Sequence, residues 1–121
     1  MSDIQESGQM YLETILVLKE KNENVRAIDI ANEMNFSKPS VSRGMKILKE
    51  NNMITIDDNG YIDFTKQGEK IAKSVYEKHK VISSLLMKIG VDKDTAIDEA
   101  CKIEHVLSDG TLSKIKKYFK M

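Results

Sequence analysis

SKPSVSRGMKILKENNMITIDDNGYIDF, residues 37–64, is the stretch that decides the fold. Ser37 is a good N-cap residue, and Pro39 two positions later suits the first turn of a helix. The apolar residues that follow recur on one helical face: Val41, Met45 and Leu48. The stretch therefore opens with a predicted helix from Lys38 to about Asn51.

The second part of the stretch is typical of a β-hairpin. Two short β-prone runs, residues 53–56 and 61–64, are separated by Asp57-Asp58-Asn59-Gly60, and an Asn-Gly pair is a strong signal for a tight hairpin turn. The two aspartates would repel phosphate at the tip of this ribbon, so we expect it to contribute little to binding of a polyanion.

Two helices are predicted before this stretch. Residues 4–20 carry apolar side chains at helical spacing, and residues 27–34 form a short amphipathic helix that breaks at Asn35. Three helices followed by a hairpin is the element order of a winged helix-turn-helix, in which the third helix enters the major groove of DNA. Residues 1–65 are therefore predicted to form a DNA-binding domain.

The rest of the chain is predicted to be helical. A long helix should begin after residues 65–68 and end at Gly90, and further helices should span Asp92 to Leu107 and Thr111 to Phe119. The predicted fold class is mainly α with a small β-hairpin, divided into residues 1–65 and residues 66–121.

Composition limits the possible functions. The chain has 121 residues and no net charge; 40% of its residues are hydrophobic and 31% are charged. A large multidomain enzyme is excluded by length. No apolar run approaches the length needed to cross a bilayer and no signal-peptide pattern opens the chain, so we expect a cytoplasmic protein that does not contact membranes.

Catalytic motifs are missing from the sequence. There is no His-Glu-x-x-His pattern and no glycine-rich phosphate loop, and the chain contains only two histidines. We therefore predict that the protein is not an enzyme and has no small-molecule substrate.

A local positive charge supports DNA binding. No acidic residue occurs between Glu33 and Glu50, a segment that holds all four basic residues of the predicted third helix. Among them, Arg43 is the best candidate for bidentate contact with a guanine. The candidate DNA-contacting residues are Arg26, Ser37, Lys38, Pro39, Ser40, Ser42, Arg43 and Lys46. The alternative is an ordinary solvated helix face.

A chain without net charge has little general attraction to DNA, because nonspecific affinity depends on neutralising phosphates. A homodimer would compensate by placing two recognition helices about one turn of double-stranded DNA apart. An apolar stripe is the predicted dimer surface, and the alternative is that it belongs to the core of a single chain: Val81, Leu85, Leu86 and Ile89.

A metal-ligating pattern lies near the end of the chain. Cys101, Glu104 and His105 stand at positions i, i+3 and i+4, so on a helix they share one face. A thiolate, a carboxylate and an imidazole from one turn suit a divalent transition metal that finds a further ligand elsewhere. The alternative is that Cys101 fills the core while the other two residues are exposed.

The sequence resembles the diphtheria toxin repressor and manganese transport regulator family of metal-dependent repressors over nearly its whole length. The segments that carry the resemblance are residues 10–15 (MYLETI), Ile30-Ala31, residues 37–42 (SKPSVS), Lys78-His79 and residues 99–109 (EACKIEHVLSD). The resemblance implies a winged helix-turn-helix repressor whose second half, residues 66–121, binds metal and dimerises. Longer members also carry a domain similar to an SH3 fold, which this sequence does not include.

The iron-responding members imply a primary metal site. Its ligands correspond to one methionine of the first helix and three residues of the segment 99–109: Met10, Cys101, Glu104 and His105. The iron-type second site uses a histidine that matches His79, but its other two ligands match Ser83 and Ile97 here. That site is therefore broken in this chain in its iron-type form.

The manganese-type members imply a different second site. Its ligands correspond to Glu13, His79 and Glu104, and all three are present. The manganese type has a further carboxylate where this chain has Cys101, so the sequence combines an iron-type first site with a manganese-type second site. The expected cofactor is Fe(II) or Mn(II), with up to two ions per subunit.

The expected function is a metal-dependent transcriptional repressor that controls metal homeostasis. A bound ion would join the first helix to the Cys101 segment and so fix the spacing of the recognition helices. The alternative function is a winged-helix regulator that responds to a non-metal ligand or is constitutive, with the Cys-Glu-His cluster playing a structural part.

Overall fold

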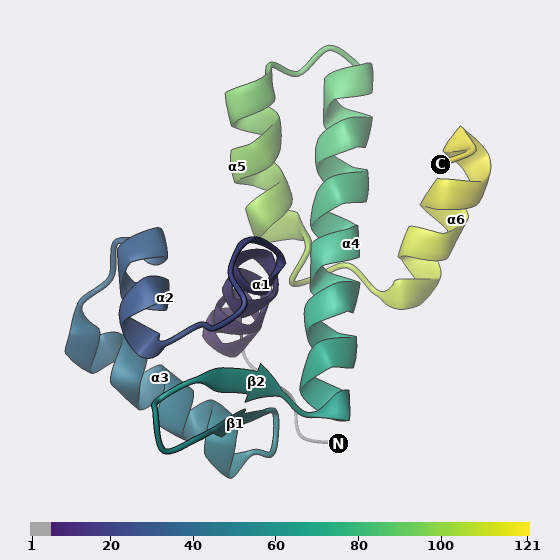
Figure 1. Cartoon of the computed structure of the whole chain (residues 1–121). Helices are drawn as coiled ribbons and strands as arrows, with labels where there is room; N and C mark the ends of the chain where they lie inside the picture. The colour runs from purple at the N-terminus through teal and green to yellow at the C-terminus, as the bar shows by residue number, and fades with distance from the viewer. Residues whose placement is uncertain (1–5) are drawn as a thin grey trace. The chain divides into compact units, whose positions relative to one another are not determined.

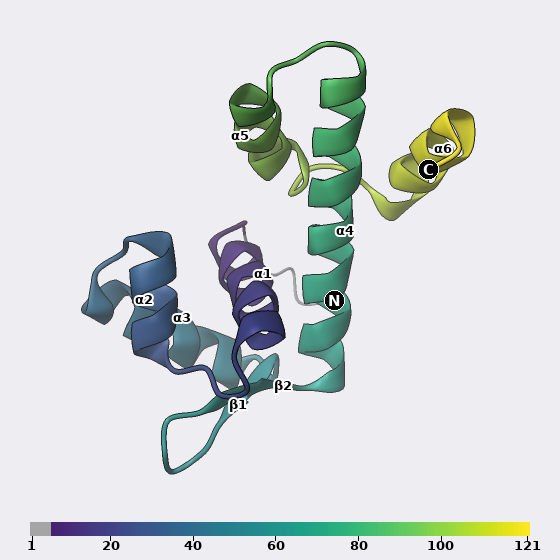
Figure 2. The ribbon, with the colours of Figure 1, turned by 45° about the horizontal axis from the view of Figure 1, so that its top comes forward.

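The computed structural model describes residues 6–121, which form six helices and one two-stranded hairpin (Figures 1 and 2). The elements are α1 (Glu6–Lys21), α2 (Ala27–Met34), α3 (Lys38–Glu50), β1 (Ile54–Ile56), β2 (Ile62–Phe64), α4 (Lys66–Lys88), α5 (Lys93–Ile103) and α6 (Asp109–Phe119). The predicted fold class is confirmed. The start that the sequence predicted for the first helix, at residue 4, lies outside the described residues.

The chain divides into two compact units, residues 1–73 and residues 74–121. The division falls within α4, eight residues beyond the predicted boundary between 65 and 66. Among the described residues, no helix is both long and apolar enough to cross a membrane.

In the first unit, α1, α2, α3 and the hairpin enclose one apolar core. Ser37 caps α3, because its hydroxyl accepts a hydrogen bond from the Ser40 backbone N–H at 3.3 Å. The predicted apolar face of α3 is buried with residues of every other element of the unit, among them Leu12, Ile15, Ile30, Val41, Met45, Leu48, Met53 and Ile62. Packing thus leaves the opposite face of α3 in solvent.

A glycine brings α1 and α3 close together. A Cβ atom placed on Gly44 of α3 would overlap the ring of Tyr11 on α1. The Tyr11 hydroxyl also donates a hydrogen bond to the Ser40 carbonyl at 3.5 Å, and its ring meets Phe36 edge-on with centroids 6.2 Å apart. The Tyr11 ring of α1 therefore lies directly against the backbone of α3 at Gly44.

The hairpin follows the sequence prediction closely. Its strands are antiparallel, with Ile54 opposite Phe64 and Ile56 opposite Ile62. The turn is held by the Asp57 carboxylate, which accepts hydrogen bonds from the backbone N–H groups of Asn59 and Tyr61, both at 2.9 Å. Gly60 provides the positive φ of 81° that this turn needs.

In the second unit, α5 is shorter than the sequence predicted. It begins after the N-cap Asp92, whose pKa is lowered by the hydrogen bonds that its carboxylate accepts from Thr95. It ends at Ile103 rather than Leu107, and residues 104–106 form a separate turn. Helix α6 begins at Asp109, two residues before the predicted start, because the Ser108 hydroxyl accepts from the Thr111 N–H at 3.1 Å.

The apolar stripe predicted for dimerisation is only partly exposed. Val81 is buried within its own chain, Leu85 and Leu86 are half-buried, and Ile89 is 67% exposed. Val81 therefore belongs to the core of its own chain, whereas Ile89 is accessible to a second copy of the chain.

Candidate metal centre and DNA interface

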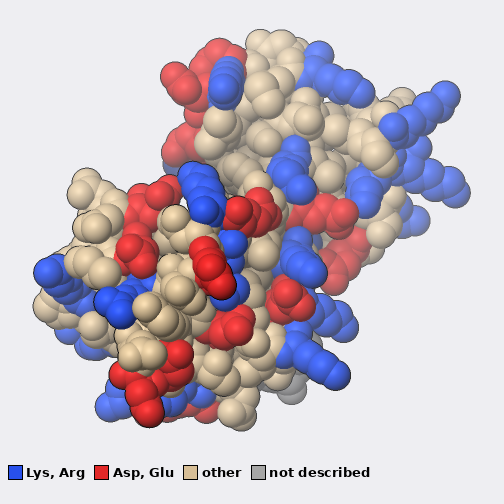
Figure 3. Space-filling model, viewed as in Figure 1, with Lys and Arg blue, Asp and Glu red and all other residues tan. Residues whose placement is uncertain are grey.

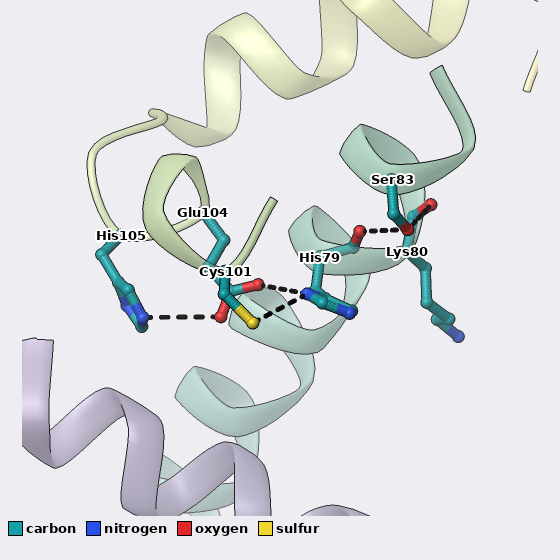
Figure 4. Close-up of polar contacts among 6 residues, drawn as sticks. All are labelled: His79, Lys80, Ser83, Cys101, Glu104 and His105. Atoms are coloured by element: carbon teal, nitrogen blue, oxygen red, sulfur yellow. Dashed lines mark hydrogen bonds and ion pairs between the residues drawn. The ribbon is translucent and has the colours of Figure 1, made fainter. Parts of the chain in front are cut away.

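The carboxylate of Glu104 is the centre of the candidate metal site. Glu104 is 1% exposed, although it stands in the turn just after α5. Its Oε2 lies 2.9 Å from Nδ1 of His79 on α4, and its Oε1 lies 3.4 Å from Nε2 of His105 (Figure 4). Burial of a carboxylate is costly unless positive or hydrogen-bonding groups surround it. The His79 imidazole supplies such a group by its hydrogen bond to Oε2, and the His105 imidazole lies beside Oε1.

Cys101 completes a three-residue cluster. Its Sγ lies 3.8 Å from the same Nδ1 of His79, and the side chain is exposed. Donor atoms of His79, Cys101 and Glu104 all lie within 4.8 Å of one another. Ligand atoms stand about 2.0–2.3 Å from a bound transition metal, so two of them are at most about 4.6 Å apart. The three residues therefore fit a metal ion with little rearrangement.

Residues that the sequence assigned to different sites meet in this cluster. His79 was expected in the second site and Cys101 in the first, yet their donor atoms lie within 4.8 Å of each other and of a Glu104 oxygen. His105 lies on the other side of the carboxylate, with a side chain that is 3% exposed. The interpretation of Cys101 as core filler is wrong, because the thiol is exposed.

Ser83 occupies one of the positions at which the iron-type second site is broken. It is buried, and its hydroxyl donates to the backbone carbonyl of His79 at 2.8 Å, within its own helix (Figure 4). The hydroxyl therefore supports the helix beside His79.

Met10 and Glu13 lie one turn apart on α1 in the first unit, and both are half-buried. Their part in metal binding stays a prediction.

The outward face of α3 carries the residues predicted to contact DNA. Lys38, Pro39, Ser42, Arg43 and Lys46 are all exposed. The first turn of α3 contains no acidic residue, and free backbone N–H groups there favour an anion. The exposed face is therefore suited to phosphates and base edges.

Ser37 and Ser40 have local partners on this face. Their hydroxyls lie 2.8 Å apart, and Nη2 of Arg43 donates to the Ser40 hydroxyl at 3.4 Å. The second contact orients the guanidinium of Arg43.

Arg26, the N-cap residue of α2, contacts the hairpin next to its turn. Its guanidinium carbon lies 4.7 Å from the centre of the Tyr61 ring, in a cation–π contact, and its backbone N–H donates to the Asp29 carboxylate at 2.8 Å. Sequence reasoning missed Tyr61, because its partner is 35 residues away and no local pattern signals the pair.

A pocket of about 170 Å³ lies between α2 and α3. It is lined by Ala27, Ile28, Lys38 and Ser42.

Comparison with known proteins agrees with both halves of this arrangement. Residues 3–69 match the model of the iron dependent repressor N-terminal DNA binding domain, and residues 65–121 match that of the iron dependent repressor metal binding and dimerisation domain. The chain belongs to the iron-dependent repressor family. The predicted family is thus confirmed.

Three relatives illustrate the range of this family. An uncharacterised HTH-type transcriptional regulator of Methanocaldococcus jannaschii is 34% identical over 92% of this chain and 90% of its own. The diphtheria toxin repressor of Corynebacterium diphtheriae is 31% identical over 99% of this chain and 54% of its own. The solved structure of the manganese regulator SloR is 31% identical, with a TM-score of 0.83 over 93% of this chain and 53% of the other.

The iron-dependent repressors in this comparison therefore differ in length. The chain spans about half of the diphtheria toxin repressor and of SloR, but nearly all of the archaeal regulator. These relatives are transcriptional regulators, and their family unites a DNA-binding domain with a domain for metal binding and dimerisation.

Proposed function

We propose that this iron-dependent repressor family member represses transcription when Fe(II) or Mn(II) binds, and so controls metal homeostasis. The observation that carries the proposal is the cluster of His79, Cys101 and Glu104, whose donor atoms lie within 4.8 Å of one another. A buried carboxylate between two imidazoles is a favourable place for a divalent cation, because the cation would neutralise the Glu104 charge.

We assign the ligands to two positions that share Glu104. Oε2 of Glu104 serves one position with His79 and Cys101, and Oε1 serves the other with His105. Met10 and Glu13 are the candidates for the remaining ligands. This assignment allows up to two ions per subunit.

Metal would act on DNA affinity through a difference between two states of the protein. The metal ion binds one arrangement of the chain more tightly than another, and DNA binds that same arrangement more tightly. A coupling of about 1–3 kcal/mol is typical of such systems. A homodimer would present two α3 helices to double-stranded DNA about one helical turn apart.

The proposal is tested by operator affinity at buffered concentrations of Fe(II), Mn(II) and Zn(II) without oxygen, measured by fluorescence anisotropy. The operator is first selected from random duplexes with metal present. We expect Fe(II) or Mn(II) to raise affinity about 5- to 150-fold over a chelator. Mass spectrometry under native conditions gives the number of ions bound. Equal affinity with and without metal would leave the non-metal or constitutive regulator as the function.

Cys101 is expected to set the choice of metal. Thiolate is a soft donor that favours Fe(II) over Mn(II), whereas carboxylate suits Mn(II). In Cys101→Asp, the ratio of the Mn(II) to the Fe(II) concentration needed for half-maximal DNA binding should fall at least about tenfold. This is the lower end of the roughly 10- to 100-fold changes in metal affinity that substitutions around a metal site cause. Cys101→Ser is the matched control and should weaken both metals. An unchanged ratio in Cys101→Asp would show that Cys101 is not a ligand.

A further inference from the structure

The positive charge of this neutral chain is concentrated in two helices. Residues 38–50, which form α3, hold four basic residues and one acidic residue, a net charge of +3. Residues 109–121, which contain α6, hold four lysines and one aspartate, also a net charge of +3. The rest of the chain therefore has a net charge of −6. The first concentration belongs to the proposed recognition helix, whereas the second has no part in the function argued so far.

Helix α6 is held in the second unit by its inner face. Leu112 is buried and Ile115 and Phe119 are half-buried. Two ion pairs join α6 to α4: Lys116 to Glu77 at 2.9 Å and Asp109 to Lys78 at 3.0 Å. Lys116 thus has a structural partner, and the outer face of α6 is fixed in orientation by these contacts.

Three lysines follow one another at the C-terminal end of the chain, two on α6 and the third at its C-cap. Lys114, Lys117 and Lys120 are exposed and spaced three residues apart, and we call them the lysine ridge. Within residues 6–121, no acidic side chain forms an ion pair with any of the three. Figure 3 shows the lysine side chains of α6 projecting into solvent at the right edge of the molecule. Closely spaced, exposed lysines of this kind are suited to a polyanion.

We propose that the lysine ridge binds DNA phosphates without sequence preference, as a second contact that accompanies reading of the operator by α3. The proposal rests on the proposed function, which brings this chain to DNA. Lysine is a point charge that contacts phosphate but reads no base edge when it lies along the backbone. The first unit has a net charge of −2 over residues 1–73, so its general attraction to phosphate is weak. The ridge supplies the missing attraction.

Other occupants fit α6 less well. A helix that binds anionic lipid inserts an apolar face beside its basic face. The apolar face of α6 instead packs within the unit, and the exposed apolar residues beside the lysines are Tyr118, 82% exposed, and Met121, 38% exposed. An acidic surface on a second copy of the chain is the remaining alternative.

The test uses the full chain with all three ridge lysines replaced by glutamine (K114Q, K117Q and K120Q). The dissociation constant is measured against KCl concentration at saturating metal, for the selected operator and for a random duplex. Each phosphate neutralised contributes about 0.9 to the slope of log affinity against log salt. Loss of three contacts in each subunit, six in the proposed homodimer, should therefore lower the slope by about 5.4 on both duplexes. Between 50 and 200 mM salt, wild-type affinity should fall about 1,800-fold further than that of the variant.

Two variants control for the change of net charge and for folding. K88Q, K93Q and K102Q together remove the same charge from exposed positions of the same unit, and should change the slope much less. K114R, K117R and K120R together keep the charge and should keep the wild-type slope. The ratio of operator to random affinity, and its response to metal, should be unchanged in all three variants.

The outcomes separate this proposal from the proposed function. If the ridge variant and the K88Q/K93Q/K102Q variant have the same slope, the ridge does not contact DNA, whatever the metal response. A changed dimer dissociation constant with an unchanged slope would assign the ridge to a second copy of the chain and overturn the proposal. Failure of the wild-type chain to respond to metal, with the slope difference present, would overturn only the metal-dependent function.

Discussion

Replacement of Glu104 with glutamine is expected to abolish the response of DNA binding to metal. Both Glu104 oxygens face imidazoles, so the substitution removes the charge at the centre of the cluster while keeping the shape of the side chain. The wild-type gain in operator affinity, expected at about 5- to 150-fold, should fall to about onefold. Glu104→Gln should also bind Fe(II) and Mn(II) much more weakly in equilibrium dialysis.

Glu99→Gln is the matched control for this experiment. Glu99 lies on α5 near the same cluster in sequence, but it is exposed. It should therefore keep the wild-type metal response. Circular dichroism of both variants without metal establishes that they fold. A Glu104→Gln protein that folds and retains the full gain in affinity would remove Glu104 from the metal site.

Loss of Arg43 and Lys46 together is expected to weaken operator binding by about 100-fold or more. Both side chains are exposed on the outer face of α3, and a good bidentate contact to a base contributes about 1–3 kcal/mol to discrimination. The double variant Arg43→Ala/Lys46→Ala should approach the affinity of the wild-type chain for random DNA. Metal binding, measured on the same preparation, should be unaffected.

The control is Lys70→Ala/Lys73→Ala, which removes two exposed positive charges from α4. This control should lower operator affinity only a few-fold, which is the effect expected from the loss of two positive charges that do not contact DNA. Similar losses in the two double variants would mean that α3 does not read the operator. A selective loss of a protein partner with intact DNA binding would indicate a winged helix used for protein contact.

The elements that sequence reasoning predicted well are those with local causes. The Ser37 cap and the apolar face of α3 depend on residues a few positions apart, and the Asn59-Gly60 turn dictates where the two strands meet. For the same reason, residues 27–34 are helical as predicted, with Asn35 in the left-handed conformation at the end.

The end of α5 shows what local patterns do not determine. No glycine or proline stands between Cys101 and Ser108, so the helical pattern continues past the true end at Ile103. The Ser108 cap of α6 was a usable signal for the start of the next helix. The turn places Glu104 inside the second unit, and its 1% exposure is a property of tertiary packing that spacing along the chain does not encode.

The ligand types were readable from the sequence, but their grouping was not. Resemblance assigned His79 and Cys101 to separate sites, whereas packing of α4 against the end of α5 brings both into one cluster with Glu104. The Arg26–Tyr61 contact is similar, since only the folded hairpin brings the ring to the guanidinium.

The Tyr11 ring and Gly44 pack without a gap where α1 meets α3. Even one methyl group would not fit between the Tyr11 ring and the Gly44 backbone. We therefore expect a displacement of α1 at Tyr11 to displace α3 as well. We expect any side chain at position 44 to push the Tyr11 ring away from α3, and so to shift the proposed recognition helix even when every proposed metal ligand and DNA contact is kept.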